Sequence, residues 1–333
     1  MALIFIDGFD GYDINNANVA IKMSEHWGAI TQSGDGFKVK SGRYDDGKSI
    51  EFWSSGPAEL RTNDFWPAAN TDFAIIGFNF KLTAANADTV KLELFSDDDS
   101  EGVLNFNDDG LTMNHNSVEV FNLPIADTDW HNIEIIITRI SITECNIQIY
   151  VDDVNRYESA AFNPVQDYTK SQDYCAFTLN GTNGSVLTID DFYILDSLTD
   201  DNNERIGADI RVETLFPSGS VNELWNFAGD VSRHEAVNNV PYDPTEYIST
   251  SSANQTQQFL FDDLVNIVEP LGMQIRTVAK GDPGVIYKHM VNNAIVGSTY
   301  ADLTSTYKER STIFDQGVYD VSAVNNIEAG VSS

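Results

Sequence analysis

Carboxylates are the side chains that this sequence supplies most generously for chemistry. A glycosidase needs two of them facing one cleft, about 5–9 Å apart, and on a strand such a pair is typically written Glu-x-Asp-x-x-Glu. No such motif occurs, and acids instead gather in turn-like segments such as 97–101 and 107–109. The Gly-x-Ser-x-Gly motif of a serine nucleophile is also absent. The sequence therefore names no catalytic residue and predicts a protein that is not an enzyme.

Histidines offer a second kind of chemistry but are dispersed along the chain. They are His26, His115, His131, His234 and His289, and their spacing matches no metal-binding motif. His131 follows Trp130 at the start of a predicted strand, where it could serve as a catalytic base. A hydrogen bond to the backbone is the commoner role at such a position, and it is the role that we assign.

Calcium prefers carboxylate oxygens, and three groups of acids are close enough in sequence to supply them. The groups are Asp97, Asp98 and Asp99 with Glu101, then Asp152 with Asp153, then Asp190 with Asp191. The first group lacks the spacing of a calcium loop and is more typical of a solvated hairpin tip. Neighbouring strand residues point to opposite faces, so Asp190 and Asp191 share a site only across a bulge. We assign no metal ligand and leave calcium open as a cofactor.

Carbohydrate binding needs an exposed aromatic side chain beside several polar groups. Trp27, Trp53 and Trp66 are the candidates, although large aromatic residues more often fill cores. Asn180 and Asn183 begin sequences that match glycosylation signals, and we interpret both as turns. The binding residues, if a sugar is bound, stay unknown at this stage.

Alternation of apolar and polar residues indicates the elements that would position these groups. In the segment 130–158, isoleucines recur at every second position, and Asp152-Asp153 forms a plausible two-residue hairpin turn. Similar runs at 73–82, 90–96, 103–115 and 187–196 are separated by turn signals. Turn signals at this spacing are typical of a β-sandwich.

A polar, turn-rich segment at 197–205 separates two strand-rich blocks. We therefore predict an all-β fold with two β-sandwich domains, residues 1–197 and 205–333. In the second domain we expect strands at 259–269, 273–280, 284–292 and 309–315, and a long loop over 230–258. A short helix near the C-terminus would be capped by Asp320 or Ser322 and end at Gly330.

Charge and cysteine content exclude several classes of protein. The chain carries 19 Lys and Arg against 51 Asp and Glu, a net charge of −32, which repels nucleic acids and anionic lipid. The N-terminus shows no secretion signal, and no stretch reaches the roughly 18 apolar residues of a membrane span. We expect no nucleic-acid partner, no membrane insertion and synthesis in the host cytoplasm. We interpret Cys145 and Cys175 as buried free thiols, although a disulfide between them stays possible.

Three stretches together resemble the concanavalin-like (laminin-G-type) jelly roll. They are IDGFDGYD with SGRYDDGKSIEFW downstream, then DTDWHNIEIIITR with IQIYVDDV, then LTIDDFYILD. The tail, RIGADIRVETLFPSG through VSAVNNIEAGV, is similar to the C-terminal half of virion structural proteins of tailed bacteriophages that carry this jelly roll. Asp153 departs from the family, which often has glycine there, and this leaves the turn type open.

The resemblance implies a first domain with a concanavalin-like jelly roll and a location in the virion. It supplies no site residue. We expect a non-enzymatic structural protein displayed on the particle, as tail fibre, tail tip or head decoration, bound to other virion proteins and to copies of itself. The alternative is a lectin-like protein that recognises a glycan of the host surface.

Overall fold

The computed structural model divides into two compact units, Met1–Val212 and Glu213–Ser333. The structure describes residues 2–12, 23, 26–32, 36–44, 47–54, 57–62, 73–83, 90–96, 99–107, 109–115, 118–125, 127–141, 144–161, 173–179, 184–197, 205–240, 243–265, 267, 269–314 and 320–333. Residues 205–212, which the sequence places with the second domain, belong to the first unit.

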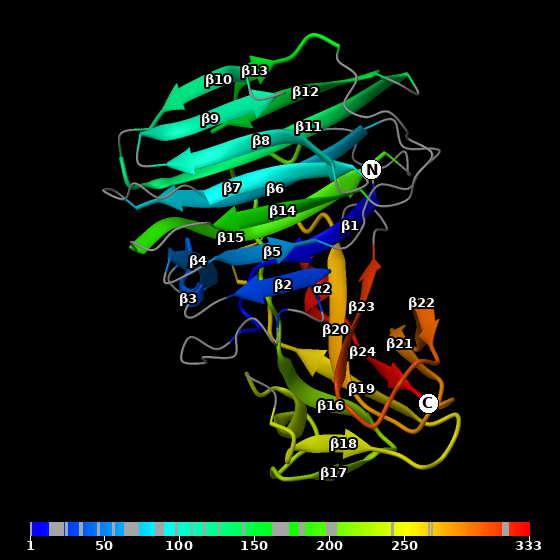
Figure 1. Ribbon diagram of the computed structural model, residues 1–333. Coiled ribbons are helices and arrows are strands. Elements are labelled where there is room, and N and C mark those ends of the chain that lie inside the picture. The colour runs from blue at the N-terminus through cyan, green and yellow to red at the C-terminus, as the bar shows by residue number, and fades with distance from the viewer. Residues whose placement is uncertain are drawn as a thin grey trace. The chain divides into compact units, whose positions relative to one another are not determined.

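The first unit is built from two antiparallel sheets (Figure 1). The eight-stranded sheet has the order β13-β12-β11-β6-β15-β4-β3, with β1 also paired to β15. Its strands are β1 (Ala2–Asp7), β3 (Phe37–Ser41), β4 (Lys48–Ser54), β6 (Phe73–Leu82), β11 (Trp130–Ser141), β12 (Glu144–Val151), β13 (Val154–Glu158) and β15 (Gly184–Asp196).

The seven-stranded sheet has the order β10-β9-β8-β7-β14-β5-β2. Its strands are β2 (Ala29–Gln32), β5 (Ala58–Arg61), β7 (Val90–Ser96), β8 (Asp99–Asn107), β9 (Gly110–His115), β10 (Val118–Pro124) and β14 (Asp173–Leu179). The chain crosses between the sheets repeatedly, for example from β5 to β6 and on to β7, as in a jelly roll.

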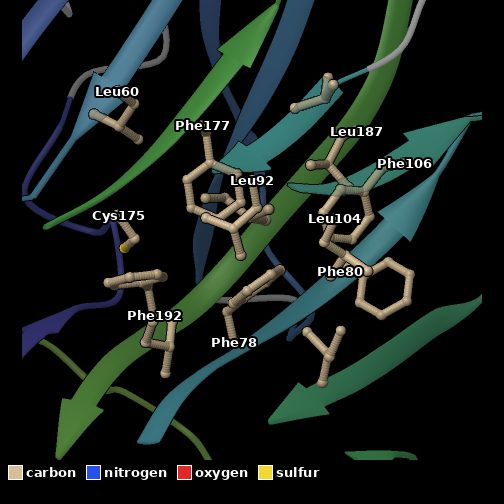
Figure 2. Packing of buried hydrophobic residues seen from close by; sticks show 14 of the residues in the cluster. Leu60, Phe78, Phe80, Leu92, Leu104, Phe106, Cys175, Phe177, Leu187 and Phe192 are labelled. Atoms are coloured by element: carbon tan, nitrogen blue, oxygen red, sulfur yellow. The ribbon is translucent and has the colours of Figure 1, made fainter. Parts of the chain in front are cut away.

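Both sheets turn their apolar residues toward one shared core. Phe78 and Phe192 from the eight-stranded sheet meet Phe177 from the seven-stranded sheet, with ring centroids 5.2–6.0 Å apart. Figure 2 shows these rings between the strands, with Leu92 and Leu104 beside them. Because side chains alternate along each strand, every second residue is left on an outer face, and these outer faces carry the polar groups discussed below.

The hairpin of β12 and β13 turns through Asp152 and Asp153, which have φ angles of 51° and 63°. Positive φ at both central residues defines a type I′ turn, which matches the twist of the strands it joins. Aspartate tolerates this conformation. The turn is therefore made without the glycine that the family resemblance would supply.

The second unit is also antiparallel β. A five-stranded sheet has the order β16-β19-β24-β21-β22, and β17–β18 and β20–β23 form two-stranded ribbons. The elements are β16 (Pro217–Glu223), β17 (Asn226–Ala228), η1 (Glu235–Val237), β18 (Tyr247–Ser249), β19 (Thr256–Phe261), β20 (Met273–Ala279), β21 (Tyr287–Val291), β22 (Ala294–Tyr300), β23 (Lys308–Phe314), α2 (Val321–Asn325) and β24 (Ala329–Ser332).

A buried histidine ties the β20–β23 ribbon to the sheet of the second unit. His289 Nδ1 lies 2.7 Å from Thr312 Oγ1 on β23, and its Nε2 lies 2.9 Å from Thr277 Oγ1 on β20. Tyr287, its neighbour on β21, places its hydroxyl 2.8 Å from the same Nε2. Burial lowers the pKa of His289 to about 4, so the ring is neutral at physiological pH.

The predicted fold class is confirmed: the chain is all-β, with sandwiched antiparallel sheets and a short helix near the C-terminus. Asp320 caps that helix, since its carboxylate accepts from the Ser322 N–H at 2.6 Å. The helix ends at Asn325 and not, as predicted from the sequence, at Gly330. Gly330 lies within β24, which begins at Ala329. No described helix is long and apolar enough to cross a membrane.

Several strands of the second unit were not predicted from the sequence. β22 follows β21 through Asn292 and Asn293, whose φ angles of 48° and 67° form a second tight hairpin turn. The region 230–258, expected as a loop, contains β18 and the turn η1. Both cysteines are buried, one in each sheet of the first unit, and they form no disulfide. Burial raises the pKa of Cys175 to about 12.

Candidate functional site

A row of polar side chains crosses the outer face of the seven-stranded sheet. Each strand contributes one residue, and each residue stands opposite the next in the strand register. The residues of this polar row, from β10 to β2, are Asn122, Thr112, Asn105, Lys91, Thr178, Glu59 and Thr31. Residues directly opposite one another in a ladder share a face. The polar row is therefore one continuous feature assembled from segments far apart in sequence.

The strand neighbours of the polar row show that it faces outward. Leu60, Leu92 and Leu104 each precede a row residue or follow one, and all three lie in the core. Thr31 and Asn122, at the two ends of the row, are exposed, whereas Asn105 near its middle is 9% exposed. Asn105 donates to Thr112 Oγ1 at 3.4 Å, so neighbouring row residues already contact each other.

The outer face of the eight-stranded sheet is different, because residues 205–212 lie across it. We call this segment the strap. Ile206 and Ile210 of the strap pack against Ile75, Tyr193 and Leu195 of the sheet. The strap therefore covers apolar side chains that the alternation of the strands leaves on this outer face.

Glu134 holds the start of the strap. It is 0% exposed, and its Oε1 accepts from the N–H groups of Ile206 and Gly207 at 2.9 and 3.1 Å. The Tyr193 hydroxyl donates to the same oxygen at 2.7 Å. Arg205 Nη1 lies 3.0 Å from the other oxygen, Oε2. A buried carboxylate satisfied by several donors in this way serves as a structural anchor.

Gly77 makes this arrangement sterically feasible. It lies on β6, between Tyr193 on β15 and Glu134 on β11, and faces both across the ladders. A Cβ atom at Gly77 would lie 2.1 Å from the Tyr193 ring. Only glycine therefore lets the tyrosine reach across β6 to Glu134. Burial, followed by the charge of Glu134, raises the pKa of the Tyr193 hydroxyl, which keeps it a donor.

The acid pair Asp190 and Asp191 holds the far end of the strap. A bulge in β15 shifts its register with β6 between Asp190 and Tyr193, and Asp191 has a φ of 52°. Asp191 accepts from the Val212 N–H at 2.7 Å and from Asn79 Nδ2 at 2.8 Å. Asp190 accepts from the N–H groups of Arg43 and Asp191. Burial raises the pKa of both carboxyl groups, and the charge of Asp191 raises that of Asp190 further.

The hairpin pair Asp152 and Asp153 separates into two roles. Asp153 accepts from Arg205 Nη2 at 3.1 Å and from the Ala208 N–H at 3.2 Å, and so becomes a third anchor of the strap. Asp152 instead lies near the start of β11, where it accepts from the Asn132 N–H at 3.0 Å. The two carboxylates therefore do not converge on one point.

His131 lies between two carboxylates. Its Nδ1 lies 2.7 Å from Asp152 Oδ2, and its Nε2 lies 2.8 Å from Asp127 Oδ1. Partial burial lowers the pKa of His131, but the hydrogen bonds to Asp152 and Asp127 outweigh it and raise the pKa above its ordinary value. With both nitrogens engaged, the ring joins a loop to the hairpin tip. Its partners are side chains, whereas the sequence indicated a backbone partner.

The two predicted aromatic candidates that the structure describes, Trp27 and Trp53, have separate surroundings. Trp27 is 1% exposed and donates to buried Asp7 at 2.9 Å, and Lys38 Nζ lies 3.5 Å from the ring centre of Trp53. Trp66, Asn180 and Asn183 lie outside the described residues, as do the side chains at 97–101 and of His115.

Two further histidines that the structure describes have unrelated contacts. His26 stacks on Phe5, and His234 contacts Ser232 in the second unit. Among the described residues, no three His, Cys, Asp or Glu side chains are placed to hold a metal ion. Sequence reasoning missed Glu134 as an anchor, although a lone acid inside the apolar run of residues 133–137 was the available signal.

The sequence matches no protein-family model, and it matches no curated protein. Among solved structures it is similar to a carbohydrate esterase of the Shiga toxin-encoding bacteriophage phi24B, at 13% identity and a TM-score of 0.40, over 58% of this chain and 98% of that one. It is also similar to an endo-β-1,4-glucuronan lyase of the fungus Trichoderma reesei, at 13% identity and a TM-score of 0.37, over 52% and 92%. The carbohydrate recognition domain of Emp46p matches at 12% identity and a TM-score of 0.37, over 58% and 100%. At these TM-scores the likeness supports no conclusion about function.

Substitution of Glu134 by glutamine is expected to loosen the strap. The change removes the buried charge opposite Arg205, and breaking a buried pair in this way costs about 3 kcal/mol. Amide exchange at Ile206 and Gly207 should accelerate, and the first unit should unfold at lower urea. Glu158→Gln, an exposed acid on β13, serves as the control and should change stability by less than about 0.5 kcal/mol. Unchanged exchange at Ile206 and Gly207 in Glu134→Gln would contradict the anchoring role.

The His131 contacts predict a pH-dependent contribution to stability. Because the folded-state pKa is raised, the stabilisation is complete below the unfolded-state pKa of about 6.5 and is lost as pH rises through the folded value. The unfolding free energy of the wild type relative to His131→Asn should therefore fall between about pH 6 and pH 8. Urea titrations of both proteins measure this difference, and a constant difference across that range would refute it.

Proposed function

We propose that this chain is a non-enzymatic structural protein displayed on the surface of a bacteriophage virion, as tail fibre, tail tip or head decoration. The observation that carries the proposal is the use of its buried carboxylates. Glu134, Asp190 and Asp191 accept backbone N–H groups and so hold segments of the chain in place. These acids therefore stabilise the fold. The proposed location on the virion rests on the family resemblance of the sequence.

The acids of the seven-stranded sheet also favour a role without catalysis. Glu59 and Glu93 lie on β5 and β7, with β14 between them, and they stand opposite Thr178 and Ala176. Glu93 also accepts from Thr178 Oγ1 at 2.9 Å.

The surface charge fits a protein displayed at high density. A net charge of −32 keeps free subunits apart before assembly and keeps the outer faces of particles from adhering to one another. We expect the partners to be other virion proteins and further copies of this chain.

A second candidate function is carbohydrate binding, and the polar row favours it. Hydroxyl and amide side chains aligned across a sheet can both donate and accept hydrogen bonds, as sugar hydroxyls require. This function is compatible with display on a particle, where it would serve recognition of a host-surface glycan.

Labelling of intact particles tests the proposed location. Antibodies raised against the purified chain should bind undisrupted virions at regular positions in electron micrographs, and pre-immune serum should not. The purified chain should show no turnover of polysaccharides. Absence of the protein from purified virions, epitopes reached only after disruption, or measurable polysaccharide cleavage would refute the proposal.

A glycan array tests the second candidate. The wild type should retain at least one glycan, and the double variant Lys91→Ala/Asn122→Ala should bind it about ten-fold more weakly, since each lost hydrogen bond contributes about 0.5–1.5 kcal/mol. The matched control Lys40→Ala/Asn155→Ala removes the same groups from the eight-stranded sheet and should bind normally. A parallel array with chelator reports whether calcium takes part. No retained glycan, or equal loss in both variants, rules out sugar binding at the polar row.

A further inference from the structure

The buried ring of His289 is surrounded by hydroxyl groups. The side chain belongs to β21 and is 0% exposed. Thr312 Oγ1 lies 2.7 Å from Nδ1, while Thr277 Oγ1 and the Tyr287 hydroxyl lie 2.9 and 2.8 Å from Nε2. A hydroxyl group can donate or accept but carries no charge. These partners therefore suit a neutral ring and cannot neutralise a protonated one.

A chain of hydrogen bonds assigns the hydrogen of the neutral ring to Nδ1. The Tyr300 hydroxyl donates to the Ser311 carbonyl oxygen and also lies 2.9 Å from Thr312 Oγ1. Because the Tyr300 hydrogen is used for the carbonyl, the Thr312 hydroxyl donates to Tyr300 and accepts from Nδ1–H of His289. Nε2 is then the acceptor nitrogen of the ring, and a hydroxyl group on its other side donates to it.

Protonation of Nε2 conflicts with this arrangement. The new N–H can only donate, so the hydroxyl groups of Thr277 and Tyr287 would have to redirect their own hydrogens within a buried site. The ring would also carry a positive charge away from water, which is costly without a counter-ion. Burial lowers the pKa of His289 to about 4 for this reason.

The ribbon of β20 and β23 does not supply a counter-ion. Its face toward His289 carries two charged residues, Lys308 and Arg310, which are both cations. Glu309 lies on the opposite face, where it accepts from Arg276 Nε at 2.9 Å and Nη2 at 3.1 Å. Arg310 is paired with Asp302. The acids near the ribbon are therefore engaged by arginines.

The other strands around His289 do not supply one either. β22 and β24, which flank β21 in the sheet, contain no charged residue. Lys288 alternates to the other face of β21. Glu223 on β16 lies two strands beyond β24's partner face and pairs with Arg233 at 3.0 Å. Tyr287 and Tyr300 pack against the ring, and a phenol is uncharged in acid.

Few apolar contacts hold the ribbon if the contacts of His289 are lost. The apolar cluster around Tyr287 has two further buried residues, Leu303 and Val331, and Ala279 is the described ribbon residue that packs against it. Two paired strands alone are marginally stable in water. The hydrogen bonds of Thr277 and Thr312 to the ring are therefore a main connection between the ribbon and the sheet.

We propose that His289 is an acid-sensitive switch in the second unit: a proton on Nε2 detaches the β20–β23 ribbon from the five-stranded sheet. This inference does not rest on the proposed function. Several groups of the first unit respond in the opposite direction, because the pKa values of His131, Asp190 and Asp191 are raised in the fold and their protonated forms are favoured there. Acid thus acts selectively on the second unit.

The pH range follows from the direction of the pKa shift. Folding lowers the pKa of His289 from an ordinary value of about 6.5 to about 4. The stabilisation by the neutral ring is complete above the higher value and is lost as pH falls toward the lower one. Since a detached ribbon exposes the ring to water, the detached population should rise at least about ten-fold from pH 7 to pH 5.

Amide hydrogen exchange of the full-length chain tests this, expressed as protection factors at pH 7, 6 and 5. Protection of residues 273–279 and 308–314 should fall at least about ten-fold across this range, and that of β16 and β19 should fall less. In His289→Gln the ribbon should show no such fall. His234→Gln replaces a histidine of the same unit that contacts Ser232 and should keep the wild-type profile.

A second pair of variants tests the missing counter-ion. Thr277→Asp places a carboxylate beside Nε2 and should reduce the fall in ribbon protection, whereas Thr277→Val, which is similar in shape and uncharged, should retain it. Constant ribbon protection in the wild type from pH 7 to pH 5, or an equal fall in His289→Gln, overturns the proposal. An equal fall in β16 and β19 also overturns it, since the whole unit would then open. If His289→Gln does not fold, the wild-type profile and the Thr277 pair decide.

Discussion

The first unit depends on buried carboxylates that accept hydrogen bonds from the backbone of distant segments. Glu134 lies in the middle of β11, where alternation directs it to the outer face of the eight-stranded sheet, and the strap supplies the N–H groups that make its burial tolerable. An ionised carboxylate without such partners would be expensive to bury. Glu134 and the strap therefore require each other, and the compact unit extends to Val212 for this reason.

The same constraint explains the irregular features of this face. Tyr193 reaches Glu134 only across a glycine, and Asp191 reaches the Val212 N–H only because β15 is bulged there. Bulges and strand glycines are places where a sheet departs from its regular pattern to aim a particular side chain. Here each departure serves the strap. The strap thereby covers part of the outer face of the eight-stranded sheet, whereas the outer face of the seven-stranded sheet carries the polar row.

This asymmetry corresponds to the two functions that we propose for the molecule. One sheet face is committed to internal architecture through acids, and the other carries hydroxyl and amide groups suited to hydrogen bonding with a ligand. A displayed virion component with a glycan-binding face would use both. The net negative charge disfavours anionic ligands and self-association, and it leaves neutral hydrogen bonding unaffected.

Sequence patterns served well where the determining interactions are local. The strands of β6, β11 and β12, the Asp152-Asp153 turn and the Asp320 cap were all readable, since each follows from period, turn chemistry or capping within a few residues. β22 was missed because Asn292-Asn293 was not read as a turn. The sequence shows that Asp190 and Asp191 can share a site only across a bulge. It does not show whether the bulge exists, since nothing in the alternation of β15 distinguishes a bulged strand from a regular one.

The sequence by itself determined the class of the fold, several strands of the first unit and the net charge of the chain. Only the tertiary structure decided which residues act together. The polar row consists of single residues from seven strands, which are brought into register by pairing between distant segments. The role of the strap becomes visible only from its contacts with the buried acids. Side-chain alternation is a property of each strand alone, whereas register and the partners of a buried charge arise from the packing of the whole unit.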